Sequence, residues 1–229
     1  MPSILAAAQR SIKVRVWVQF ALATLTLATT SIGTLAAPPP YEKSARYHVF
    51  VDGRRSGTQD VEFVPQPNGF TVNTALSVRV NIAFVTVYRY QQDGQEDWSH
   101  GKAMGFEYTT NDDGKISHVA AQRDGDTFAV TAANGDKTAI PATAAMPPAM
   151  WNPDIVRHDH LVDPETGKLV ALSVTPLTKT SAKIAKTQIH GRGFAIDSFI
   201  KGELWFNQHN QLIALSFTKD GHKIELVKI

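Results

Sequence analysis

The sequence contains no cysteine. This excludes disulfide bonds, thiolate metal sites, a cysteine nucleophile and a lipid-modified N-terminal cysteine. It also lacks a G-x-S-x-G nucleophile elbow, an H-E-x-x-H zinc motif and a phosphate loop of the G-x-x-x-x-G-K-[ST] type. Charged residues make up only 19% of the chain and hydrophobic residues 43%, a balance that is typical of a folded domain rather than a disordered chain.

The first 36 residues have the pattern of a secretory signal peptide. They contain Arg10, Lys13 and Arg15 but no acidic residue, and an uncharged, mostly apolar run covers 16–37. Cleavage after Ala36 places Thr34 and Ala36 at the two positions before the cut where signal peptides have small residues. The alternative is an uncleaved anchor, because about 20 apolar residues can span a bilayer. We expect cleavage, no stable membrane span afterwards, and a periplasmic or secreted protein.

Charge outside this segment is nearly balanced. The whole chain has 23 basic and 21 acidic residues; three basic and no acidic residues lie in 1–36, so 20 basic and 21 acidic residues remain, a net charge of −1. The basic character of the chain therefore belongs to the predicted signal. We expect no nucleic-acid partner, because the remainder has no overall attraction for phosphates.

Residues 37–229 are predicted to form a single all-β domain, mainly antiparallel: a curved meander sheet or a partly open barrel. Short runs rich in Val, Ile, Thr, Phe and Tyr alternate with turn-forming pairs such as Asp52-Gly53, Asp93-Gly94, Asp113-Gly114 and Asp220-Gly221. The segment 71–80 shows the strict alternation of a strand with one buried face.

Two strands are apolar on both faces, 84–90 and 212–217. Such strands are expected to be buried on both sides, by a sheet that curls over itself or by a covering segment. A Pro- and Ala-rich stretch, 139–158, is the least strand-like part of the domain, with one helical turn around 148–156. We expect it to pack Met146, Met150 and Trp151 over an open end of the sheet.

The aromatic residues have two interpretations, a ligand site or core packing. The candidates for lining an apolar pocket are Tyr88, Tyr90, Trp98, Trp151 and Trp205. The alternative for the tryptophans is core packing.

Two polar patterns indicate other chemistry. His158 and His160 are two residues apart, so in an extended segment both imidazoles could hold one metal ion, with Asp154 or Asp163 as a third ligand. Glu96, Trp98 and His100 fall at alternate positions and could form a carboxylate, an aromatic platform and a general base. The alternatives are a polar loop rim for the histidines and ordinary cross-strand packing for Trp98.

The chain resembles uncharacterised exported bacterial proteins that are grouped as domains of unknown function. The residues that carry the resemblance span most of 47–205: Tyr47, Val51-Asp52-Gly53, Gly57, Tyr88-Arg89-Tyr90, Glu96-Asp97-Trp98, Gly101-Lys102, Tyr108-Thr109-Thr110, 148–151, 163–167 and Glu203-Leu204-Trp205. The resemblance implies a periplasmic, largely antiparallel β domain and supplies no catalytic residues.

Three functional hypotheses follow. The leading one is an exported, non-enzymatic cell-envelope domain that binds an apolar or amphipathic ligand, such as a lipid, between the curved sheet and 139–158, and that needs no cofactor. The second is an envelope hydrolase or metal-binding protein that uses Glu96 and His100, or His158 and His160. The third is a scaffold that binds through a strand edge.

Overall fold

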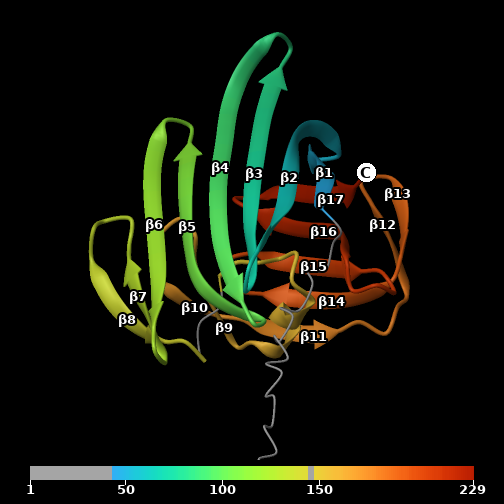
Figure 1. The fold of residues 1–229 in the computed structure, drawn as a ribbon. Helices are drawn as coiled ribbons and strands as arrows, with labels where there is room; N and C mark the ends of the chain where they lie inside the picture. Colours follow the sequence, from blue (N-terminus) through green and yellow to red (C-terminus); the bar gives the residue numbers. More distant parts are fainter. Residues whose placement is uncertain (1–42, 144–146) are drawn as a thin grey trace, which may run out of the picture. The chain divides into compact units, whose positions relative to one another are not determined.

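Thirteen antiparallel strands form one sheet in the computed structural model, which describes residues 43–143 and 147–229 (Figure 1). The predicted signal segment and Met146 lie outside the described residues. The strands follow in the order β11-β14-β15-β16-β17-β1-β2-β3-β4-β5-β6-β7-β8. Their bounds are β1 Ser44–Val51, β2 Arg54–Gln66, β3 Gly69–Ile82, β4 Val85–Ser99, β5 Lys102–Asp112, β6 Lys115–Asp124, β7 Thr127–Thr131, β8 Lys137–Pro141, β11 Ser173–Pro176, β14 Arg192–Asp197, β15 Lys201–Phe206, β16 Leu212–Lys219 and β17 His222–Lys228.

The first and last strands of the sequence meet in the middle of this sheet, where β1 pairs with β17. The sheet is curved but not closed, because β8 and β11 remain as its two edges. The predicted all-β antiparallel meander is therefore confirmed. Each edge strand is short and ends in a proline, Pro141 or Pro176, which limits pairing with a further strand.

Tight turns join most neighbouring strands as the sequence predicts. Asp52-Gly53, Asp113-Gly114 and Asp220-Gly221 have positive φ at both residues, which suits the twist of a two-residue hairpin. The expected turn at Asp93-Gly94 is wrong, because both residues lie inside β4. Gly94 is needed there for packing: a Cβ atom at this position would lie 2.3 Å from a ring carbon of Tyr108.

The inner face of the sheet is covered by segment 147–172. Trp151, Ile155, Leu161 and Val162 from this segment are buried in one cluster with the inner side chains of the sheet. The segment contains the 3₁₀ helix η1 (Pro153–Arg157) and the small sheet of β9 (His160–Val162) and β10 (Leu169–Ala171). The expected helical turn around 148–156 is thus a 3₁₀ turn.

The outer face of the sheet is covered only over strands β15, β16 and β17. Residues 181–190 form a hairpin on this face, β12 (Ser181–Ile184) and β13 (Thr187–His190), with positive φ at the turn residues Ala185 and Lys186. Ile184 and Ile189 pack against Trp205, Ala214 and Val227 of β15, β16 and β17. The buried Glu225 side chain accepts a hydrogen bond from the Ala185 backbone N–H at 3.1 Å. The predicted two-sided burial of 212–217 is confirmed.

The predicted two-sided burial of 84–90 is wrong. The hairpin of β3 and β4 extends beyond its neighbours, as Figure 1 shows, and leaves the side chains of Phe84, Val85 and Val87 exposed. No element of the described chain covers this end. Within 43–143 and 147–229 there is also no helix that is long and apolar enough to cross a membrane.

Candidate functional site

Strand β4 positions four of the residues that the sequence singles out. Tyr88, Tyr90, Glu96 and Trp98 share the inner face of the strand because side chains alternate along it, and the burial pattern follows the same alternation. His100 follows the strand in the β4–β5 turn, where it is exposed.

Glu96 is sealed inside the inner face, with 1% of its surface exposed. One carboxylate oxygen accepts a hydrogen bond from the Tyr108 hydroxyl at 2.5 Å. The other accepts from the indole N–H of Trp98 at 2.9 Å and from that of Trp151 at 3.2 Å. Burial raises the pKa of Glu96 to about 7, although the three hydrogen bonds act in the opposite direction. This carboxyl therefore anchors the covering segment to the sheet.

An aromatic cluster surrounds the carboxyl. Trp151 meets Trp98 edge to face with 5.3 Å between ring centroids, and contacts Phe63 at 5.2 Å and Phe70 at 6.1 Å. These side chains occupy the place where the sequence predicts a ligand between the sheet and 139–158. Glu96 and His100 do not converge, because the His100 ring lies in the turn, where its Nδ1 atom is 2.9 Å from the Ser99 hydroxyl.

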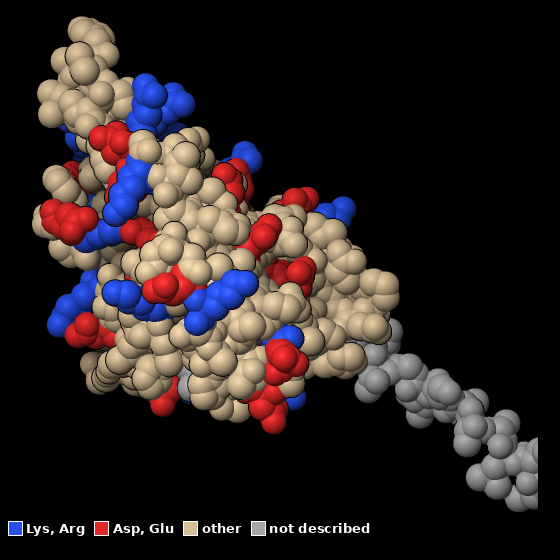
Figure 2. All heavy atoms as spheres, turned by 90° about the vertical axis from the view of Figure 1, so that its left-hand side faces the viewer, with Lys and Arg blue, Asp and Glu red and all other residues tan. Residues whose placement is uncertain are grey.

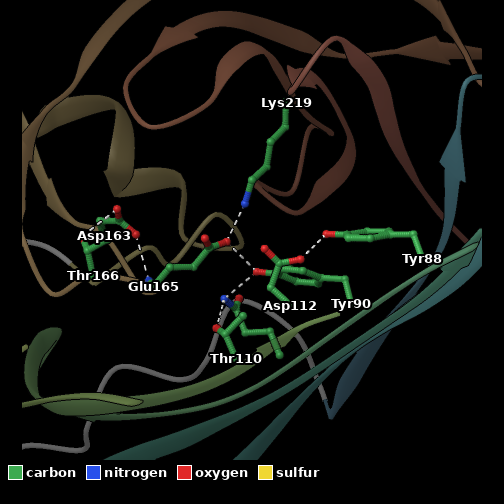
Figure 3. A network of polar contacts seen from close by, with 9 residues as sticks. Tyr88, Tyr90, Thr110, Asp112, Asp163, Glu165, Thr166 and Lys219 are labelled. Atoms are coloured by element: carbon green, nitrogen blue, oxygen red, sulfur yellow. Dashed lines mark hydrogen bonds and ion pairs between the residues drawn. The ribbon is translucent and has the colours of Figure 1, made fainter. Parts of the chain in front are cut away.

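A second polar network joins β4 to the turn between β9 and β10 and to the end of β16 (Figure 3). The Glu165 carboxylate accepts a hydrogen bond from the Tyr90 hydroxyl at 2.9 Å and forms an ion pair with Lys219 at 2.6 Å. Gln92 donates to the Tyr90 oxygen at 3.0 Å. Tyr88 donates to Asp112 at 2.7 Å. Tyr90 thus links β4 to the turn between β9 and β10, and Glu165 links that turn to Lys219 at the end of β16.

Both phenols remain protonated. Burial, followed by the nearby Glu165 charge, raises the pKa of Tyr90 far above its usual value. Burial and the hydrogen bond to Asp112 raise the pKa of Tyr88 in the same direction. Neither tyrosine is thus prepared to act as a base at neutral pH.

Trp205 lies apart from the other candidates, on the outer face. It is fully buried under the β12–β13 hairpin, and its indole N–H donates to Glu203 at 3.1 Å. The five predicted ligand-lining residues therefore fall in three separate places: Trp98 with Trp151, Tyr88 with Tyr90, and Trp205 alone.

The histidine pair has no clear third ligand. The His160 Nδ1 atom lies 2.9 Å from Asp159, while the Asp163 carboxylate is engaged by the Glu165 backbone N–H and the Thr166 hydroxyl. Among the residues that the structure describes, no group of three or more His, Asp or Glu side chains could hold a metal ion.

Two shallow hollows lie on the outer face of β2 to β8. One has a volume of about 580 Å³ and is floored by small residues such as Ala120 and Ala129. The other has about 390 Å³ and is walled by the acidic side chains of Asp60, Glu62, Asp93 and Glu107. Both hollows are open to solvent, and neither would enclose a ligand.

The feature that the sequence interpretation missed is the tip of the β3–β4 hairpin. We define the hairpin tip as residues 82–87. Ile82, Phe84, Val85 and Val87 have exposed fractions of 65%, 104%, 64% and 47%. Figure 2 shows this tip without charged atoms at its end, and both basic and acidic side chains below it. The signal was present in the sequence as the two-sided apolar pattern, but that pattern does not distinguish a buried strand from a projecting one.

Comparison with known proteins agrees with this architecture. A solved structure described as the "Crystal Structure of Beta-barrel-like Protein of Domain of Unknown Function DUF1849 from Brucella abortus" is similar with a TM-score of 0.55 and 12% sequence identity, over 81% of this chain and 95% of that chain. At this identity the likeness concerns the fold alone. No curated protein matches the sequence.

A family model matches residues 47–229, which include every strand from the middle of β1 to β17 and both covers of the sheet. The matched region contains the Glu96 anchor, the Glu165 network and the hairpin tip. The chain belongs to the family described as "Domain of unknown function (DUF6134)".

Proposed function

We propose that this protein is an exported, non-enzymatic domain of the cell envelope that binds an apolar or amphipathic partner through the hairpin tip. The observation that carries the proposal is the complete exposure of Phe84 at the end of a projecting hairpin. A phenylalanine that gains no burial in its own fold gains contact area only when a partner covers it.

The exposed apolar residues are concentrated rather than scattered. Seven large hydrophobic side chains are exposed among the described residues, and four of them belong to the hairpin tip. Single exposed hydrophobic residues are ordinary on a protein surface, whereas a contiguous group marks an interaction site.

The turn itself departs from the chemistry of its neighbours. Four other hairpin turns of this chain end in glycine, at Gly53, Gly101, Gly114 and Gly221. The β3–β4 turn instead has Ala83, with φ of 54°, followed by Phe84. An alanine in this left-handed region is strained by about 1 kcal/mol. The turn therefore carries an apolar tip at a cost to its local stability, which supports a role in contact.

The interior is a weaker candidate for the ligand. Trp98, Trp151 and Glu96 fill the space under the covering segment and satisfy one another's polar groups. The hydrolase alternative draws no support from the geometry either, since Glu96 is sealed and His100 lies in an exposed turn. Binding at the surface fits the described residues better than binding inside.

Export is supported by the sequence of 1–36, with its basic start, apolar run and small-residue end. Mass spectrometry of the protein recovered from the periplasm or the medium tests this part. A chain that begins near residue 37 is expected, and a full-length chain retained in the membrane fraction contradicts it.

Binding to phosphatidylcholine vesicles in a co-sedimentation assay tests the contact site. The exchange Phe84→Ser is expected to weaken binding about tenfold or more, because Phe84 is the largest and most exposed apolar side chain of the tip. Ile229→Ser is the matched control, since Ile229 is also exposed but lies at the end of the chain outside the tip. Equal binding by the native protein and Phe84→Ser would refute the tip as the contact site.

A further inference from the structure

We propose that the partner of the hairpin tip is an anionic phospholipid surface, with the apolar tip in the acyl boundary and two arginines against the phosphates. This inference rests on the proposed function and names its partner. It is carried by the order of side chains along the hairpin, which are apolar at the tip and basic next to it.

The hairpin changes from apolar at its tip to basic within a few residues. Ile82 and Val85 are paired across the strands next to the turn, and Arg79 and Arg89 are paired further down the same two strands. Tyr88 and Tyr90 point to the inner face, so Arg89 between them points outward. The apolar pair therefore lies three residues beyond the arginine pair along β3, next to the turn.

The spacing of these two rows matches the depth of a membrane interface. Three residues separate Ile82 from Arg79, which corresponds to roughly 10 Å along a strand. Interfacial elements bury their apolar side chains about 5–10 Å into the boundary between headgroups and acyl chains. When Phe84 and Val85 reach that boundary, the two guanidinium groups lie at the level of the headgroup phosphates, which they bind in a bidentate manner.

The arginine pair is unfavourable in the isolated domain. Arg79 and Arg89 lie directly opposite each other in the β3–β4 ladder, where like charges repel. Among the described residues, neither makes an ion pair with a carboxylate. The repulsion is relieved when an anionic surface provides counter-charges on both sides.

Further basic charge lies beside the pair. Arg54 and Arg55 begin the neighbouring strand β2, whose Gly57 pairs with Val78 of β3, and they likewise lack an ion pair within the described chain. Acidic residues also lie at this end: Asp112, the last residue of β5, accepts a hydrogen bond from the Tyr88 hydroxyl, and Asp113 donates its backbone N–H to the Arg89 carbonyl at 2.8 Å. Figure 2 shows blue side chains, with red ones among them, under the uncharged tip. The four arginines near the tip are complementary to anionic headgroups.

The form of the tip favours a lipid surface over a protein pocket. The tip projects beyond its neighbouring strands. Its two strands are paired with each other up to Ile82 and Val85, so a partner at the tip meets side chains. A fluid interface accepts such a projecting element without a complementary cavity. A protein partner with a matching pocket is the competing outcome, and the test below distinguishes it.

The experiment compares vesicles of phosphatidylcholine alone with vesicles that also contain phosphatidylglycerol, using the full chain and co-sedimentation at low and high salt. The native protein is expected to prefer the anionic vesicles and to lose that preference at high salt. Arg79→Gln and Arg89→Gln are each expected to lower the affinity for anionic vesicles about fivefold, and to leave binding to neutral vesicles unchanged. Arg157→Gln is the control, because Arg157 is exposed but belongs to η1. Every variant carries the same residues 1–36, so any lipid affinity of that segment cancels.

Three outcomes separate the hypotheses. If both vesicle types bind equally and the arginine exchanges have no effect, the anionic partner is refuted while the proposed apolar contact stands. If neither vesicle type binds, or if Phe84→Ser binds as well as the native protein, the proposed function and this inference both fall, and a protein partner becomes the better explanation. Equal circular dichroism spectra and equal urea midpoints for all variants verify that the fold is intact.

Discussion

Two segments of this chain have the same sequence pattern and opposite surroundings. Residues 84–90 and 212–217 are both apolar on their two faces, which predicts burial on both sides. Segment 212–217 is buried because the inner core lies on one side of β16 and the β12–β13 hairpin on the other. Segment 84–90 has no cover at its tip within the described residues, and Phe84 is fully exposed. A strand that is apolar on both faces thus indicates that each face needs a cover. The described chain provides both covers for 212–217 and leaves the tip of 84–90 uncovered.

Paired truncations on the outer cover and at the tip give the largest contrast. Trp205→Ala removes a fully buried indole from beneath the β12–β13 hairpin and leaves a cavity, so the free energy of unfolding should fall by about 3–5 kcal/mol. Phe84→Ala removes a side chain that has no burial to lose, and should change stability by less than about 0.5 kcal/mol. Urea unfolding of both variants measures the difference.

A large loss of stability from Phe84→Ala would contradict the comparison. It would mean that the tip is packed against part of the same chain, and the surface-binding proposal would lose its basis. A small loss from Trp205→Ala would show instead that the hairpin cover contributes little and that its burial is incidental.

The sequence allows the fold to be predicted further than the site. The Asp-Gly pairs that begin at 52, 113 and 220 predict hairpins correctly, because the turn conformation depends on these residues themselves. Glycine at position 94 is instead required by the Tyr108 ring of another strand. The Glu96 anchor could not be predicted, since Trp151 is 55 residues away in a segment without periodicity. Local chemistry is readable from the sequence, but contacts across the sheet and the absence of a cover are decided by the whole fold.

Protonation of Glu96 tests the inner cover and has the next largest effect. Its folded-state pKa is about 7 against an ordinary value of 4.5, so the folded protein binds the proton more tightly than the unfolded chain. The stabilisation is therefore complete below about pH 4.5 and is lost as the pH rises through 7, a change of about 3 kcal/mol. Groups with lowered pKa values, such as Asp52 and Asp159, act in the opposite direction and in a more acidic range.

Glu96→Gln isolates this contribution. The amide oxygen can accept both indole N–H groups, and the amide N–H₂ can donate to the Tyr108 oxygen, so the variant imitates the neutral carboxyl. Urea unfolding at several pH values between 5 and 8 should show the native protein losing stability relative to Glu96→Gln as the pH rises. Parallel curves for the two proteins would mean that Glu96 is not the titrating group and that the inner cover is not linked to pH.

The turn at the hairpin tip gives the smallest and most specific contrast. Ala83 has φ of 54°, a region that glycine occupies without strain, so Ala83→Gly should raise the free energy of unfolding by about 0.5 kcal/mol even after the greater freedom of the unfolded chain is counted. The matched control is Ala75→Gly, at an exposed position in the middle of β3, where glycine should lower stability by about 0.5–1 kcal/mol. The two exchanges are chemically identical, so opposite signs in the same urea assay isolate the turn conformation. Equal destabilisation by both would mean that Ala83 is unstrained, and the argument that the tip keeps an apolar turn at a cost to the fold would no longer hold.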